Sequence, residues 1–124
     1  RTLSIDALIQ KLSNQITSIG AYTFAACHKL SNVTIPNKVK TIDEAAFAEC
    51  RSMTKITIPD SVTSIGISAF NKCTNLNSIN IPDKVTLIGD YAFEDCSSLT
   101  SITHSLFSNP FISYFQVASF ASLM

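Results

Sequence analysis

A period of 23 residues runs along most of this chain of 124 residues. It is held by apolar columns, with variable polar residues between them. The two clearest columns are formed by phenylalanine and cysteine, namely Phe24, Phe47, Phe70 and Phe93, and Cys27, Cys50, Cys73 and Cys96. A unit of this length cannot bury its own apolar side, so its copies must stack on one another. The period therefore predicts a repeat solenoid, in which the stacked columns form the structural core.

Each copy contains a segment in which apolar and polar residues alternate and which ends in proline. In the central copy the alternating apolar residues are Ile56 and Ile58, and Pro59 follows them. Alternation is the pattern of a half-buried strand, and proline cannot extend a hydrogen-bonded ladder. We therefore expect one short strand per coil, followed by a turn.

The rest of the coil is expected to return to the next strand through a second extended piece and a turn. Val62 and Ile65 predict the second short extended segment on the opposite side of the coil. Gly66 and its equivalents are predicted to occupy turn positions with a positive φ, and Asp43 in the same column tolerates such a conformation. The spacing by three of the apolar residues that follow indicates one helical or 3₁₀ turn, carried by Phe70, Cys73 and Leu76.

The repeats divide the chain into three parts. Residues 1–20 hold a degenerate half copy, expected to act as an N-terminal cap. Residues 20–104 hold the array, with three full units and a partial one. Residues 105–124 form a tail that contains no Lys, Arg, Asp or Glu from Leu106 onward. We expect this tail to cover the open end of the solenoid; a terminal extension without a native role is an alternative, and a membrane span is disfavoured by its polar residues.

The even spacing of the cysteines argues against a metal site or a disulfide framework. Zinc ligands come in closely spaced pairs, whereas here each gap is a whole repeat. Stacked coils would place equivalent cysteines roughly 5 Å apart, but with parallel rather than converging Cβ vectors. We therefore expect a ladder of buried thiols that behave as small hydrophobic groups. No cofactor is expected.

Charge and motif content make enzymes and nucleic-acid binders poor candidates. Nine basic and nine acidic residues leave no net charge, while nucleic-acid binders show a basic patch. No phosphate-binding loop or paired metal ligands are present, and no constellation of acid, base and nucleophile is evident. His28 is expected in a loop and His104 at the end of the stack, without a ligand role for either.

The polar residues of the predicted strands form two outward columns, which are the candidate binding site. One column comprises Asn32, Lys55, Ser78 and Ser101, and the other comprises Thr34, Thr57, Asn80 and Thr103. A solenoid holds such a surface rigid for a protein or glycan partner, although any solvated sheet would carry small polar residues. Asn32 and Thr34 also fit the acceptor pattern for N-glycosylation, which is a short pattern that often arises by chance.

The sequence pattern of residues 56–76, which extends to Ile79, resembles that of the treponemal, BspA-like class of leucine-rich repeats. The resemblance covers roughly residues 7–104. It implies a right-handed, curved solenoid with short parallel strands on its concave face. It further implies a non-enzymatic, adhesin-like protein at a cell surface or secreted, which recognises proteins or glycans. An intracellular scaffold that positions other proteins, and hence a cytoplasmic location, is the alternative.

Overall fold

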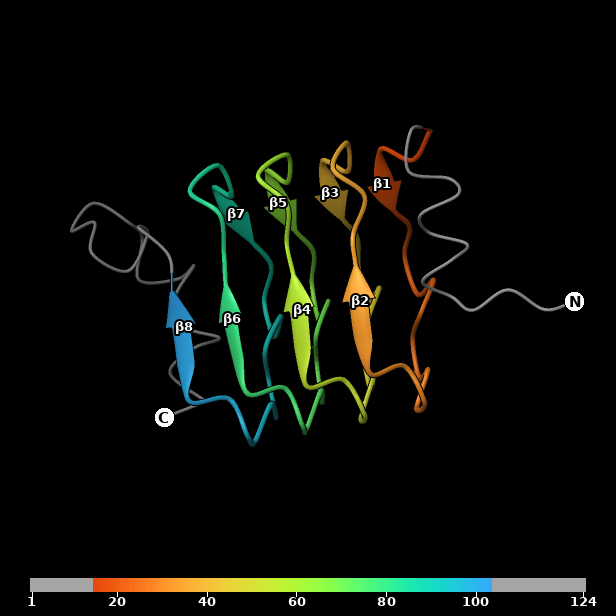
Figure 1. Ribbon diagram of the computed structural model, residues 1–124, viewed down its shortest axis with the longest axis vertical. Helices are drawn as coiled ribbons and strands as arrows, with labels where there is room; N and C mark the ends of the chain where they lie inside the picture. Colours follow the sequence, from red (N-terminus) through yellow and green to blue (C-terminus); the bar gives the residue numbers. More distant parts are fainter. Residues whose placement is uncertain (1–14, 104–124) are drawn as a thin grey trace, which may run out of the picture.

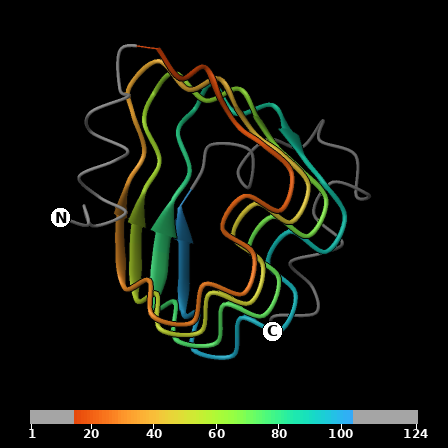
Figure 2. The ribbon, with the colours of Figure 1, turned by 90° about the vertical axis from the view of Figure 1, so that its right-hand side faces the viewer.

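The computed structural model describes residues 15–103, which form a stack of coils (Figure 1). Each coil carries one strand on each of two opposite sides, and the described residues contain no helix. The strands on one side are β1 (Ser18–Ile19), β3 (Thr41–Ile42), β5 (Ser64–Ile65) and β7 (Leu87–Ile88). Those on the other side are β2 (Asn32–Thr34), β4 (Lys55–Thr57), β6 (Ser78–Asn80) and β8 (Ser101–Thr103). Seen along the stack, the coils lie one behind another (Figure 2).

Every pairing between the described strands is parallel and joins residues that are one repeat apart in the sequence. Strands β1, β3, β5 and β7 form one continuous sheet of four strands, with Ser18 opposite Thr41 and Ser64 opposite Leu87. On the other side β2 pairs with β4 and β6 with β8. Strands β4 and β6 lie side by side in Figure 1, but the ladder is interrupted between them. The predicted repeat solenoid, with both sets of short strands, is confirmed.

A column of phenylalanine rings runs through the core of the stack. The ring centroids of Phe24 and Phe47 lie 5.3 Å apart, and those of Phe47 and Phe70, and of Phe70 and Phe93, lie 5.4 Å apart. These distances are within the range of favourable aromatic pairs. Phe47, Phe70 and Phe93 are completely buried, and Phe24 is partly buried. Phe47 and Phe70 therefore each pack against a ring of the coil before and a ring of the coil after.

The segment around the phenylalanines forms reverse turns instead of a helical turn. The amide of Cys73 donates to the carbonyl oxygen of Phe70 at 3.2 Å, as a 3₁₀ turn would require. Alternate amides, however, bond to the next coil: Phe70 N donates to Ala92 O at 2.8 Å, and Lys72 N to Glu94 O at 2.8 Å. Because every second donor bonds outside its own coil, a helix cannot propagate here.

The prediction that the repeat glycines occupy positive-φ positions is wrong. No glycine has a positive φ, and within residues 15–103 this conformation falls at two other positions of each coil, with φ between 53° and 62°. The residues concerned are Tyr22, Ala45, Ser68 and Tyr91, and Ala26, Glu49, Lys72 and Asp95.

Gly66 and Gly89 instead allow neighbouring coils to approach closely. A Cβ on Gly66 would lie 2.7 Å from the carbonyl carbon of Asp43. A Cβ on Gly89 would lie 2.6 Å from the carbonyl carbon of Gly66. Such contacts are shorter than atoms tolerate, so a side chain at either position would separate the coils.

Parts of the expected organisation lie outside the described residues. The structure covers only residues 15–20 of the expected N-terminal cap, and neither His104 nor the tail of residues 105–124. Within residues 15–103, no helix has the length and apolarity needed to cross a bilayer.

Candidate functional site

The outward side of β2, β4, β6 and β8 forms a polar surface, here called the polar face. Its described side chains are all exposed: Asn32, Thr34, Lys55, Thr57, Ser78, Asn80 and Ser101. Between them Val33, Ile56 and Ile79 point into the core, with 6% or less of their surface exposed. For Thr103 the structure places only the backbone, in β8. The strands thus hold the candidate residues in two columns on a packed support.

The parallel register aligns these residues across the coils. Asn32 lies opposite Lys55, and Thr34 opposite Thr57. On the second pair of strands, Ser78 lies opposite Ser101. Apart from Lys55, the described side chains are uncharged hydroxyls and amides, which both donate and accept hydrogen bonds. Such a surface can bind a polar partner, whereas it has no enclosed position in which a reacting group would be desolvated.

The cysteine column lies on the inside of the coils, and its three buried thiols have low reactivity. Cys50, Cys73 and Cys96 are buried and Cys27 is half-buried, all as free thiols. Burial raises the pKa of the Cys50 and Cys96 thiols to about 11, and it also raises the pKa of Cys73. Because the thiolate is the reactive form, Cys50, Cys73 and Cys96 are poor nucleophiles at neutral pH.

Metal-binding chemistry finds no support in the described part of the chain. Within residues 15–103, no three or more His, Cys, Asp or Glu side chains gather as metal ligands. His28 is exposed at the surface, and His104 lies outside the described range. Asn32 and Thr34 of the glycosylation pattern are both exposed in β2, and its use stays a prediction.

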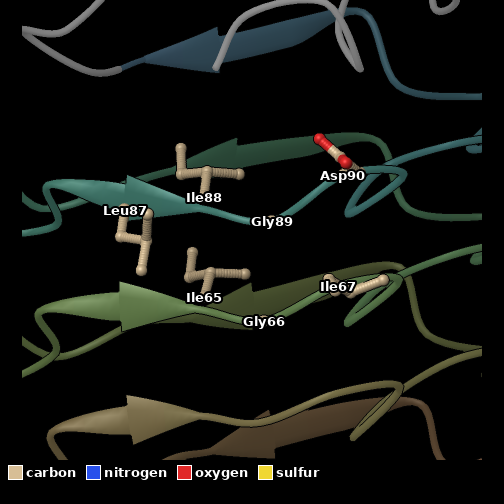
Figure 3. Close-up of a pocket in the computed structure, with 7 residues that line it drawn as sticks. All are labelled: Ile65, Gly66, Ile67, Leu87, Ile88, Gly89 and Asp90. Carbon is tan, nitrogen blue, oxygen red and sulfur yellow. The ribbon is translucent and has the colours of Figure 1, made fainter. Parts of the chain in front are cut away.

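A second surface feature was missed by the sequence analysis. Residues 65–67 and 87–90 line a hollow of ≈ 340 Å³ between the coils of β5 and β7 (Figure 3). Ile67 and Leu87, on its rim, are 50% and 55% exposed. We call this feature the Ile67–Leu87 hollow.

The sequence does carry a signal for this hollow, in departures from the repeat. Leu87 stands in a column that otherwise holds Ser18, Thr41 and Ser64. Ile67 stands in a column that otherwise holds Ala21, Glu44 and Asp90. Large apolar residues at these two positions remain about half exposed in the folded chain. A search of each repeat column for apolar residues among polar ones would have identified Ile67 and Leu87.

Comparisons with known proteins agree on one kind of repeat. Residues 7–122 match the BspA type leucine rich repeat region in six copies, so the match continues into the segment assigned above to the tail. No curated protein matches the chain.

Solved structures of bacterial leucine-rich repeat proteins are similar to this one. A leucine rich cell surface protein from Faecalibacterium prausnitzii is 42% identical, with a TM-score of 0.65 over 73% of this chain and 24% of that chain. A leucine-rich repeat protein from Eubacterium ventriosum is 33% identical, with a TM-score of 0.64 over 71% of this chain and 23% of that chain. The pneumococcal vaccine antigen PcpA, at 23% identity, shares the fold with a TM-score of 0.70 over 73% of this chain and 22% of that chain. The chain thus spans about a quarter of the length of these proteins or less.

Proposed function

This chain belongs to the BspA-type leucine-rich repeat family, and we propose on that premise that it is a non-enzymatic binding module whose polar face recognises a protein or glycan partner. The observation that carries the proposal is the polar face itself. Its exposed hydroxyl and amide groups repeat coil by coil on strands with a buried apolar backing. A partner with regularly spaced polar groups can bond to several coils at once.

The rigidity of the face favours binding. Short side chains such as Ser, Thr and Asn lose little conformational entropy when a partner covers them. The strands beneath them are held by parallel pairing and by the buried side chains of Val33, Ile56 and Ile79, so a partner would not have to order the surface. Each contact is weak, and the affinity depends on how many coils the partner spans.

A cell-surface or secreted location is part of the same proposal. One similar structure, at 42% identity, is described as a cell surface protein of a bacterium. A rigid surface of polar groups that are mostly uncharged suits contact with extracellular proteins or glycans. The location of the whole protein is best determined by surface biotinylation of cells that express it.

The test is a binding screen of the full chain against a printed glycan array and a panel of purified matrix proteins. Hits are measured again with a triple variant, Lys55→Ala, Thr57→Ala and Asn80→Ala. The control triple variant, Asn37→Ala, Lys84→Ala and Thr86→Ala, removes the same three residue types from exposed positions outside the polar face. We expect the first variant to lose binding by tenfold or more, at about 1 kcal/mol for each lost hydrogen bond, and the control to retain it. Equal binding by both variants would remove the polar face from consideration.

A further inference from the structure

The Ile67–Leu87 hollow combines exposed apolar side chains with a buried apolar floor. Ile67 and Leu87 on the rim are half exposed or more, while Ile65 and Ile88 beneath them are 1% and 6% exposed. Figure 3 shows Leu87 and Ile65 between the coils of β5 and β7, with Ile67 on the coil of β5. Covering them would remove apolar surface from water, which is the main source of binding energy in protein contacts.

Carboxylates stand on both sides of this apolar surface. Glu44 and Asp90 occupy the same repeat column as Ile67, one coil before it and one coil after it. The backbone bonds confirm this neighbourhood, since Ala45 N donates to Ile67 O and Ser68 N donates to Asp90 O, both at 2.9 Å. Both carboxylates are exposed. Within residues 15–103 the one salt bridge joins two other residues, so neither Glu44 nor Asp90 has a cationic partner there.

We infer that the Ile67–Leu87 hollow binds a segment of a partner protein in which an aliphatic or aromatic side chain is flanked by Lys or Arg. The apolar side chain would enter the hollow, whose volume of ≈ 340 Å³ is at the small end for ligand sites. The flanking cations would lie beside Asp90 and Glu44. This surface is separate from the polar face, so the inference does not depend on the proposed function.

Other occupants fit the charges less well. Anionic lipid headgroups attract basic segments and would be repelled by Glu44 and Asp90. A second copy offers little, because the large apolar residues exposed within residues 15–103 are Tyr22, Tyr91 and the two rim residues themselves. The chain's own residues 104–124 are rich in apolar residues but contain no Lys or Arg. A basic segment of another protein complements both features of the site.

The test uses two fluorescein-labelled synthetic peptides and the full chain. One peptide carries a central Leu flanked by two lysines on each side, and the other carries glutamates in place of the lysines. Binding is measured by fluorescence anisotropy, and the position of the peptide by amide chemical-shift changes in the ¹⁵N-labelled chain. Leu87→Ser and Leu87→Thr recreate residues that other copies hold in this column, so they are expected to keep the fold. Asp90→Asn removes the charge, and Asp83→Asn is its control elsewhere in the exposed surface.

We expect the lysine peptide to bind and the glutamate peptide not to bind. Each Leu87 variant should weaken binding about tenfold, the effect of losing one buried aliphatic side chain. Asp90→Asn should weaken it a few-fold at low salt, with the difference shrinking as salt is added, and Asp83→Asn should have no effect. Absence of binding, unchanged affinity in a folded Leu87 variant, or shifts away from residues 65–67 and 87–90 would each overturn the inference. So would nuclear Overhauser contacts between residues 104–124 and Leu87 in the unliganded chain.

Discussion

The thiol of Cys73 donates a hydrogen bond to the backbone carbonyl oxygen of Phe47 in the preceding coil, with Sγ and the oxygen 3.1 Å apart. The same contact joins Cys96 to Phe70 at 3.1 Å, and Cys50 to Phe24 at 3.2 Å. Cysteine is therefore more than a small hydrophobic residue here. Each thiol links its coil to the phenylalanine turn of the coil before it.

Removing one ring from the phenylalanine column should weaken the whole stack. Phe70→Ala deletes a fully buried ring with stacked partners on both sides, and such truncations cost about 3 to 5 kcal/mol. We expect a large drop in the midpoint of urea unfolding, followed by circular dichroism. Tyr91→Ala, which truncates an exposed aromatic residue, serves as the control. An unchanged midpoint for Phe70→Ala would contradict the stacked core.

Burial should decide the order in which the thiols react. In the folded chain at pH 8, iodoacetamide should modify the half-buried Cys27 first. Cys50, Cys73 and Cys96 should be protected, because they are buried and burial raises their pKa. All four should react in urea. Peptide mass spectrometry identifies the modified residues, and fast native labelling of Cys73 would speak against this packing.

The same thiols predict a loss of stability in alkali. Burial raises the pKa of Cys50 and Cys96 from the ordinary 9.0 to about 11 in the folded chain. The thiols of the unfolded chain ionise first, so the contribution of these residues is complete below pH 9 and is lost as the pH rises toward 11. We expect the free energy of unfolding to fall over this window. A double variant with Cys50→Ala and Cys96→Ala should show a shallower fall, and an identical slope would count against the prediction.

Adding a methyl group at Gly89 should force two coils apart. In Gly89→Ala the new Cβ would meet the backbone of Gly66 and Ile67 at distances that atoms do not tolerate. Since backbone cannot move aside cheaply, we expect a destabilisation of roughly 1 to 3 kcal/mol, as for other overpacking changes. Ser97→Ala, at an exposed position of the same coil, is the control. A melting temperature equal to that of the unaltered chain would show that the coils can separate without cost.

Glycine should be favourable at a position where the sequence has lysine. Lys72 is exposed and has a φ of 61°, a conformation that costs other residues about 1 to 2 kcal/mol. Lys72→Gly should relieve this cost and, after the added entropy of the unfolded chain, stabilise the protein by about 1 kcal/mol. Lys72→Ala keeps the Cβ and should change little. Chemical denaturation measures both, and a destabilised glycine variant would be the contrary result.

The periodic columns made much of the core predictable. Val33, Ile56 and Ile79 alternate with polar residues in every copy, and the strands form at these positions. The cysteine spacing likewise indicated buried thiols, and three of the four are buried. Column by column comparison could also have revealed Leu87, an apolar exception among Ser and Thr. The alternating pattern predicted the polar face as an exposed surface. It does not identify the partner, because small polar residues occur on any solvated sheet.

The sequence by itself determined that this chain is a stack, because a 23-residue unit with one apolar side has no other way to bury it. Only the tertiary structure decided how the backbone turns within each coil. Ser68 N bonds to Asp90 O of the next coil, and Ser68 takes a positive φ. A serine at position 68 does not by itself predict a positive φ. The conformation is imposed by hydrogen bonds between coils, which outweigh the residue's own conformational preference. The close approach of neighbouring coils likewise requires glycine at positions 66 and 89.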